Sequence, residues 1–173
     1  KKQALSMESI YTLKNLKMLS LKGNKIELYL SKLTQLEALY YKYGIKIKNV
    51  ESLSNLKDLF ILSFRGLNLN LLKGLLNLKR LRLSGGYFVS LDGIGALNKL
   101  ERLDITYNSK LADATQINEL ICLREFHIEK CKSLNDFSFL EGNSTIEELF
   151  IDKLNSLSFI SSMKKLKSIN FGD

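Results

Sequence analysis

Leucine and other apolar residues recur along this chain at fixed spacings within a repeated unit. In each unit the first apolar residue is followed by others three, six and eight positions later, as in Leu13, Leu16, Leu19 and Leu21. The pattern returns seven times after its first occurrence, 20 to 23 residues apart. The units begin at Leu13, Leu33, Leu53, Leu75, Leu97, Leu120, Asn143 and Met163. We therefore expect one domain, residues 1–173, in which 13–173 form the repeats and 1–12 are the remnant of an N-terminal cap.

The last two apolar positions of each unit alternate with polar residues, which indicates a β-strand with one buried face. One unit cannot bury its leucines alone, so neighbouring units must stack and share a core. The first buried column is Leu19, Leu39, Leu59, Leu81, Leu103, Phe126, Leu149 and Ile169, and the second is Leu21, Tyr41, Ile61, Leu83, Ile105, Ile128, Ile151 and Phe171. A third apolar column is expected to close the back of the coils, at Ile47, Leu67, Val89, Leu111, Leu134 and Leu157.

At this copy number, the motif L-x-x-L-x-L-x-x-N/C resembles that of the leucine-rich repeat family over roughly residues 10–173. About ten residues remain for each return segment, which suits a turn of 3₁₀-helix or extended chain. That length resembles the short-repeat, internalin-like bacterial class. The resemblance implies an α/β fold: a right-handed solenoid of about eight repeats, with a parallel β-sheet on the concave face and short 3₁₀ or extended segments on the convex face. It also implies that the concave face binds a partner.

The family's internal hydrogen-bond ladder is incomplete in this chain. In the family, Asn or Cys at the ninth motif position caps backbone groups inside the coil. Here the position holds Asn24, Gly44, Phe64, Gly86, Asn108, Cys131 and Leu154. Three of these seven residues match, so we expect the remaining hydrogen bonds to be made elsewhere.

Composition favours a reduced, bacterial compartment. Two cysteines do not make a disulfide framework, and the absence of proline with many Lys, Asn and Ile residues suits a bacterial protein. We therefore expect a cytoplasmic location rather than secretion or the cell surface. No apolar run approaches the ~18 residues that would span a membrane, so membrane insertion is not expected. The terminal strand would leave an edge at Phe171 that could pair with another chain, so the oligomeric state stays open.

Charged residues alternate in sign down almost the whole of one exposed strand column. This column, two positions before the first buried residue, is Lys17, Glu37, Lys57, Lys79, Glu101, Arg124, Glu147 and Lys167. Equivalent positions in adjacent parallel strands are direct neighbours. We interpret the column as a self-neutralising ladder.

The column between the two buried residues has a different character. It reads Ser20, Tyr40, Phe60, Arg82, Asp104, His127, Phe150 and Asn170, with Met18, Leu62 and Tyr43 near its aromatic end. An exposed apolar patch usually marks a contact surface, although Tyr40 and Phe60 could also be no more than a stacked surface pair. Residues 1–86 hold 16 Lys and Arg against 5 Asp and Glu, and residues 87–173 hold 10 against 13. The face is therefore expected to be a strip that is basic and aromatic, then arginine-rich, then acidic.

The residues around His127, the only histidine, do not favour chemistry. Glu125, Glu129 and Asp104 surround it, but a metal site would need a second nitrogen or thiolate ligand. No nucleophile is expected beside it, and no glycine-rich loop precedes a helix as phosphate binding requires. We expect no enzyme and no cofactor.

The sequence thus predicts a non-enzymatic module that binds a protein partner on its concave face, in the role of a bacterial immunity protein, an adhesin or a scaffold. The predicted contact residues are Met18, Tyr40, Lys42, Tyr43, Phe60, Leu62, Arg80, Arg82, Asp104, Tyr107, His127, Glu129 and Phe150. The alternative is nucleic-acid binding through the basic N-terminal half of the same face.

Overall fold

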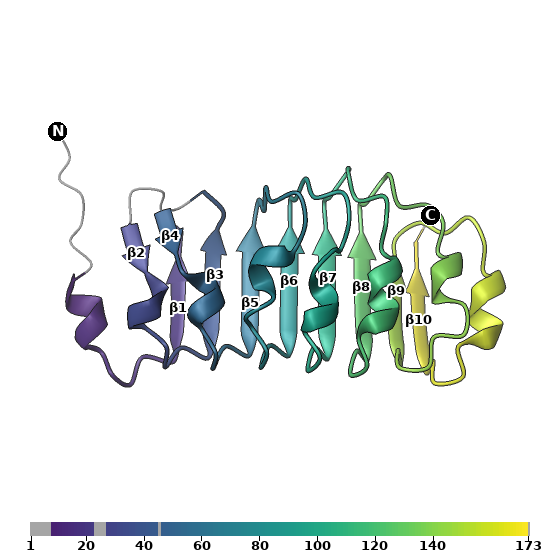
Figure 1. The fold of residues 1–173 in the computed structure, drawn as a ribbon. Coiled ribbons are helices and arrows are strands. Elements are labelled where there is room, and N and C mark those ends of the chain that lie inside the picture. The colour runs from purple at the N-terminus through teal and green to yellow at the C-terminus, as the bar shows by residue number, and fades with distance from the viewer. Residues whose placement is uncertain (1–7, 23–26, 45, 173) are drawn as a thin grey trace.

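Every repeat contributes one strand to a parallel sheet that runs the length of the molecule. The computed structural model describes residues 8–22, 27–44 and 46–172. Within them, eight strands pair in an order that follows the chain, β1-β3-β5-β6-β7-β8-β9-β10 (Figure 1). Their bounds are β1 Met18–Leu21, β3 Ala38–Lys42, β5 Asp58–Leu62, β6 Arg80–Ser84, β7 Arg102–Thr106, β8 Glu125–Glu129, β9 Glu148–Ile151 and β10 Ser168–Phe171. The parallel sheet of the predicted solenoid is confirmed.

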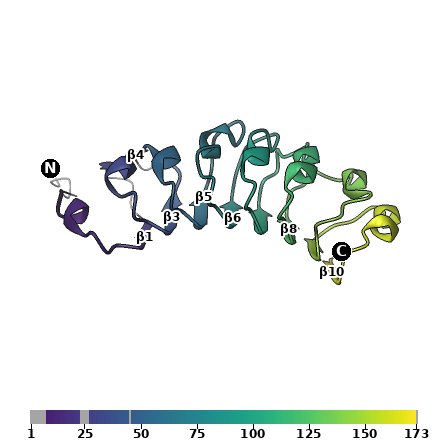
Figure 2. The same ribbon diagram turned by 60° about the horizontal axis from the view of Figure 1, so that its bottom comes forward.

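Short 3₁₀-helices return the chain on the side opposite the sheet. The described residues contain no α-helix, because about ten residues must turn and come back in each unit. The helices are η1 Glu8–Thr12, η2 Leu30–Lys32, η3 Val50–Ser52, η4 Asn70–Leu72, η5 Ile94–Ala96, η6 Thr115–Glu119, η7 Ser138–Leu140 and η8 Ser158–Ser162. Figure 2 shows the coils forming an arc with the helices outside and the sheet inside, so the sheet is the concave face.

The first two coils carry a second, smaller sheet on their outer side. Strands β2 (Glu27–Tyr29) and β4 (Lys46–Lys48) pair in parallel there. The Lys48 ammonium lies 3.2 Å from a Glu27 carboxylate oxygen and 5.0 Å from the Tyr29 ring centroid. Each of these strands is followed in the same coil by a 3₁₀-helix, η2 or η3.

The two predicted strand columns form the core except on β10, where Ile169 is half-buried and Phe171 is exposed. Leu59, Leu81 and Leu103 are fully buried, as are most of their equivalents. Phe171, however, is 51% exposed. It lies on β10, the edge strand of the sheet, which has a neighbouring coil on one side only.

The predicted third column is wrong in three repeats. Leu67, Val89 and Leu157 are exposed, whereas Leu69 and Leu91, two positions after the first two of these, are fully buried. In these two repeats a polar residue, Asn68 or Ser90, directly precedes the buried leucine. Its side chain accepts the backbone N–H two residues later, and the residue between them enters the core. This arrangement occurs at Asn68, Ser90, Asp113 and Asp136, which precede the buried Leu69, Leu91, Ala114 and Phe137.

Inside the coil, aromatic rings replace part of the ninth-position ladder. The Phe64 ring meets Tyr43 and Phe88 edge-on, with centroids 5.1 and 5.8 Å apart. Further along, the buried Asn108 amide donates to the Phe88 carbonyl at 2.9 Å and accepts the Lys110 backbone N–H at 3.1 Å. The predicted cap at Asn24 lies outside the described residues.

A second polar ladder links the turns that precede the strands. The side chains of Gln35, Asn55 and Asn77, two residues after their unit's first leucine, each donate to a backbone carbonyl of the preceding unit at 2.8–2.9 Å. The sequence shows this signal as a polar residue between two motif leucines, but we did not predict its role. It supplies contacts between coils that the broken ninth-position ladder does not.

Candidate functional site

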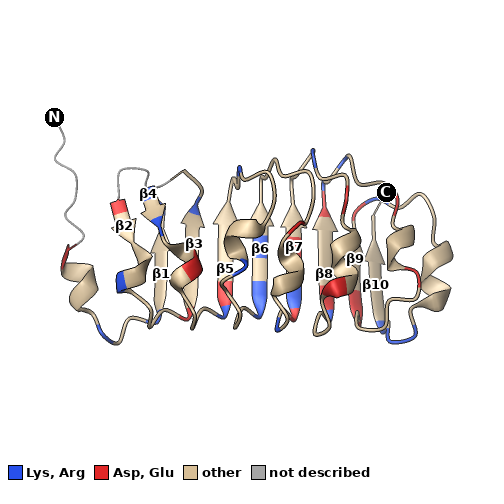
Figure 3. Cartoon of the chain, viewed as in Figure 1, with Lys and Arg blue, Asp and Glu red and all other residues tan. Residues whose placement is uncertain are grey.

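The central column of the concave face is in the register that the sequence predicts. Tyr40 lies opposite Phe60, which lies opposite Arg82, and Asp104 lies opposite His127. This register follows from the burial of the flanking leucines, because a shift of one residue would turn every core side chain outward. Figure 3 shows the charge along the sheet changing from blue on β6 to red on β8 and β9.

An apolar hollow opens in the N-terminal half of this face. It is lined by Ser20, Leu21, Lys22, Tyr40, Tyr41, Lys42, Phe60, Leu62 and Arg82. The guanidinium carbon of Arg82 lies 5.4 Å from the Tyr40 ring centroid and 5.2 Å from that of Phe60. Both distances permit a cation–π interaction. We call Tyr40, Phe60 and Arg82 the aromatic–arginine cluster, and all three are half-buried.

A buried carboxylate holds this cluster in position. Asp58 is 5% exposed, and its Oδ2 accepts the Tyr40 hydroxyl at 3.1 Å and pairs with an Arg80 nitrogen at 3.1 Å. Arg82 lies 3.9 Å from the other carboxylate oxygen. Burial, followed by the negative charge of Asp58, raises the pKa of the Tyr40 hydroxyl. The burial of Asp58 was not predicted from the sequence.

An arginine hollow follows in the middle of the sheet, lined by Asp58, Arg80, Arg82, Arg102 and Asp104. Arg102 donates two hydrogen bonds of 2.9 Å to Asp104 and one of 2.6 Å to Glu125. The hydrogen bonds to Asp104 and the two carboxylate charges raise the pKa of Arg102 above its ordinary value. Arg102 therefore already pairs closely with two carboxylates, whereas the carboxylate oxygen nearest to Arg82 is 3.9 Å away.

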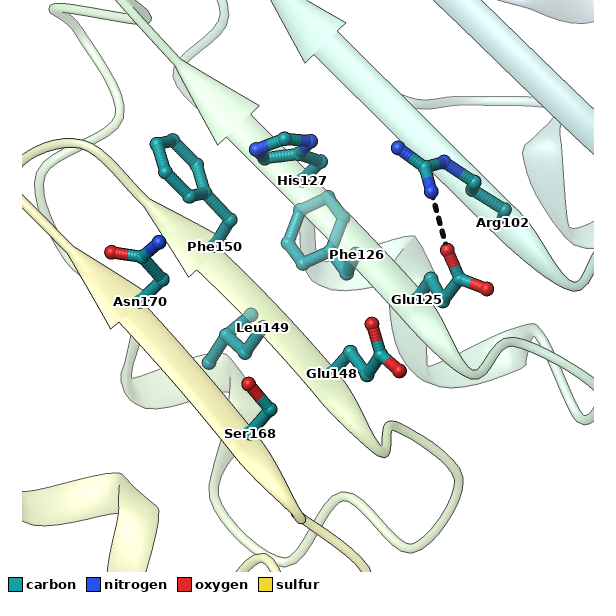
Figure 4. Close-up of a pocket in the computed structure, with 9 residues that line it drawn as sticks. All are labelled: Arg102, Glu125, Phe126, His127, Glu148, Leu149, Phe150, Ser168 and Asn170. Atoms are coloured by element: carbon teal, nitrogen blue, oxygen red, sulfur yellow. Dashed lines mark hydrogen bonds and ion pairs between the residues drawn. The ribbon is translucent and has the colours of Figure 1, made fainter.

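An acidic hollow lies at the C-terminal half and is shown in Figure 4. Its two glutamates, Glu125 and Glu148, are direct neighbours on β8 and β9. The His127 ring meets the Phe150 ring edge-on at 4.1 Å between centroids, and its Nδ1 lies 3.0 Å from Asp104. His127 Nε2 is buried and has no hydrogen-bond partner within the described residues.

The alternating charge column pairs as the sequence predicts. Glu37 contacts Lys17 at 3.0 Å and Lys57 at 2.7 Å, and Glu147 contacts Lys167 at 2.6 Å. Lysine hydrogen bonds and charges lower the pKa of both Glu37 and Glu147. This column is satisfied within the protein, in contrast to the hollows beside it.

The remaining predicted contact residues do not share one place. Met18 and Leu62 are exposed on the sheet, 58% and 40%. Tyr43 instead turns inward and packs on Phe64, so it does not join the apolar hollow. Tyr107 and Glu129 lie near the strand ends, where the Lys130 ammonium is 3.2 Å from the Tyr107 hydroxyl and 3.3 Å from a Glu129 oxygen.

Neither a metal cluster nor a membrane span emerges from the part of the chain that the structure describes. There, no three His, Cys, Asp or Glu side chains come together as metal ligands would. The same residues include no helix long and apolar enough to cross a bilayer.

The coil shape is shared with solved structures, whereas no protein-family profile and no curated protein matches the sequence. The chain is similar to an internalin of Listeria monocytogenes (InlF), with a TM-score of 0.73 and 20% identity over 92% of this chain and 48% of that one. This chain has the leucine-rich repeat fold. The repeat protein also resembles the leucine-rich repeat domain of the type III effector XopL (TM-score 0.60, 18% identity, 95% of this chain and 71% of that one) and the L. monocytogenes internalin InlC2 (0.56, 21%, 95% and 75%).

The repeat protein thus spans about half the length of the first of these structures, 48% of that chain. Identities of 18–21% establish a common backbone arrangement. They do not carry over a partner, because function depends on the side chains of the face and not on the fold.

Proposed function

We propose that this repeat protein binds another protein on its concave face and does not catalyse a reaction. The observation that carries the proposal is the aromatic–arginine cluster, which lies in the open hollow of the sheet. Tyrosine and arginine are enriched among the residues that dominate protein interfaces. Arg82 is 44% exposed at its side chain, so a partner has access to it.

The cluster is also preorganised. Asp58 holds Tyr40 by a hydrogen bond, and the same carboxylate lies near Arg82. Side chains that are already ordered lose less conformational entropy on binding, which favours affinity. The cluster adjoins an open hollow that is also lined by the exposed Leu62 and by Lys22 and Lys42. Such a hollow favours a binding role for the cluster over that of a stacked surface pair alone.

The test is affinity capture from a lysate of the source cell with three baits. One bait is the wild type, and a second carries Tyr40→Ala, Phe60→Ala and Arg82→Glu. The third is a matched control with Leu76→Ala and Ile121→Ala, two residues that are 59% and 70% exposed in the turns between helices and strands. We expect one protein to be retained by the wild type and the control and lost by the triple variant. Equal capture by all three baits would remove the concave face as the binding site.

Nucleic-acid binding is the second candidate, because Lys22, Lys42, Arg80 and Arg82 share the N-terminal half of the face. It predicts an affinity for single-stranded RNA or DNA that falls steeply with salt. A protein interface anchored on Tyr40 and Phe60 would survive moderate salt. The acidic hollow opposes a phosphate backbone that continues along the groove, which is why we favour a protein partner.

We further propose that the protein acts in the bacterial cytoplasm as an immunity protein or a scaffold, whereas the adhesin role would require secretion. Cytoplasmic action is supported by two free cysteines, one of them the exposed Cys122. Cell fractionation with an antibody to the native protein tests the location. The identity of the captured partner separates the roles, since a toxin supports immunity and a host receptor supports adhesion.

A further inference from the structure

The concave face carries charge that its own side chains do not balance. At the N-terminal half, Lys22 and Lys42 line the apolar hollow with Arg82, and among the described residues neither lysine pairs with a carboxylate. At the C-terminal half, Glu148 is exposed opposite Glu125, and no described cation lies within ion-pair distance of it. The face therefore presents one uncompensated positive region and one uncompensated negative region.

The acidic hollow has the groups that a cationic side chain requires. Among the described residues, Arg102 is the one lysine or arginine that lines it, beside the carboxylates of Glu125 and Glu148. One Glu125 oxygen is already bound to Arg102 (Figure 4). The Phe150 ring supplies an aromatic wall, and such a wall attracts a lysine or arginine.

The three hollows adjoin one another along the concave face, and we call the row that they form the groove. Arg82 lines both the apolar and the arginine hollow, and Arg102 lines both the arginine and the acidic hollow. Between them, Asp58 is buried, and its Oδ1 accepts no hydrogen bond from the described residues. A buried carboxylate oxygen without a donor is costly. This oxygen lies 3.9 Å from the Arg82 guanidinium and is buried, so Asp58 orders the floor of the groove and does not itself contact a bound segment.

We propose that the groove binds an extended segment of a partner protein whose charge order is opposite to that of the face. An apolar side chain of the segment lies over Tyr40 and Phe60, an acidic side chain follows at Arg82, and a lysine or arginine enters the acidic hollow at Glu148. This inference rests on the proposed function and specifies the chemistry of the partner. Charge complementarity of this kind orients a partner and excludes others.

Strand spacing sets the distances between these three contacts. Parallel strands lie about 4.8 Å apart, and Phe60 on β5 is four strands from Glu148 on β9, a span of about 19 Å. An extended chain advances about 3.3–3.6 Å per residue, so about six residues separate the apolar anchor from the cation. Arg82 lies one strand from Phe60, which places the acidic residue about two positions after the anchor.

Synthetic peptides test this order directly. The first probe peptide has the sequence leucine, glycine, glutamate, serine, serine, serine, lysine, with both ends blocked. A second probe has the reversed sequence, because the segment could lie in the groove in either chain direction. In a third and a fourth peptide the glutamate and lysine are exchanged. Binding to the ¹⁵N-labelled full chain is followed by two-dimensional NMR, which detects weak affinities. We expect one probe direction to give saturable shifts in β5–β9 and to bind at least tenfold more tightly than its exchanged counterpart.

Glu148→Lys is the deciding variant, because Glu148 is exposed and its loss removes no described ion pair. We expect it to abolish the tenfold preference, whereas the control Glu141→Lys, at an exposed turn, retains it. The proposal is overturned if the exchanged peptides bind equally well, if no peptide gives a saturable shift, or if Glu148→Lys leaves the preference intact. If a captured partner still binds Glu148→Lys as it binds wild type, the protein-binding function stands and this inference alone fails.

Discussion

Replacing Asn108 by alanine, compared with the same change at an exposed asparagine, tests how strongly burial sets the cost of losing a side-chain hydrogen bond. Asn108 is fully buried and makes two hydrogen bonds, to the Phe88 carbonyl and from the Lys110 N–H. Its loss leaves the Phe88 carbonyl unpaired in the core, which costs about 1–3 kcal/mol. Losing the part-buried bond to Lys110 adds about 1 kcal/mol. We expect the free energy of unfolding to fall by roughly 2–4 kcal/mol in total.

The matched control is Asn55→Ala. Asn55 also donates one hydrogen bond of 2.9 Å to a backbone carbonyl, that of Thr34, but both residues are exposed. Water replaces the lost donor, so we expect a decrease below about 1 kcal/mol.

Urea unfolding followed by circular dichroism and by tyrosine fluorescence measures both variants. Agreement of the two signals tests whether the solenoid unfolds as one unit. An Asn55→Ala variant as destabilised as Asn108→Ala would refute the reasoning, because burial would then not determine the cost of these bonds.

Three further outcomes are expected. Phe64→Ala, at a fully buried residue, should lower the free energy of unfolding by about 3–5 kcal/mol. Leu67→Ala, at a residue that is 77% exposed, should change it by less than about 0.5 kcal/mol. Thermal and urea unfolding measure both variants. A thiol reagent at about pH 8 should modify Cys122 alone in the native protein and both cysteines after unfolding, because burial raises the pKa of Cys131 to about 11. The lowered pKa of Glu37 contributes stability that is present above its ordinary value of 4.5 and is lost as the pH falls through the lowered folded value. Glu37→Gln should therefore lose less stability than wild type between about pH 6 and pH 3, and equal losses would contradict the role of its lysine pairs.

The register of the concave face was predictable because it follows from a local rule. Alternation places Leu59 and Ile61 inward and Phe60 outward, and the repeat spacing then sets Phe60 beside Tyr40 and Arg82. No other register buries the same leucines. The paired charges of Lys57 and Glu37 were predictable for the same reason.

The return segments were harder to predict because they have no such period. Leu67 and Leu69 are both apolar and two positions apart, so the pattern alone does not say which enters the core. In the structure Leu69 is the buried one, and Asn68 accepts the Asn70 N–H at the start of η4. Tyr43 was misplaced in a similar way, since its ring follows the buried Phe64 and not the strand face.

By itself, the sequence determined the repeat, the strand columns and the composition of the concave face, because periodic burial is a property of the chain's local pattern. The tertiary structure alone decided that Arg82 lies over two rings, that Asp58 is buried and that no described cation lies within ion-pair distance of Glu148. Each of these depends on side-chain directions and on distances between residues about twenty positions apart. Such contacts are set by how the coils stack and by which oppositely charged groups then lie close enough to pair.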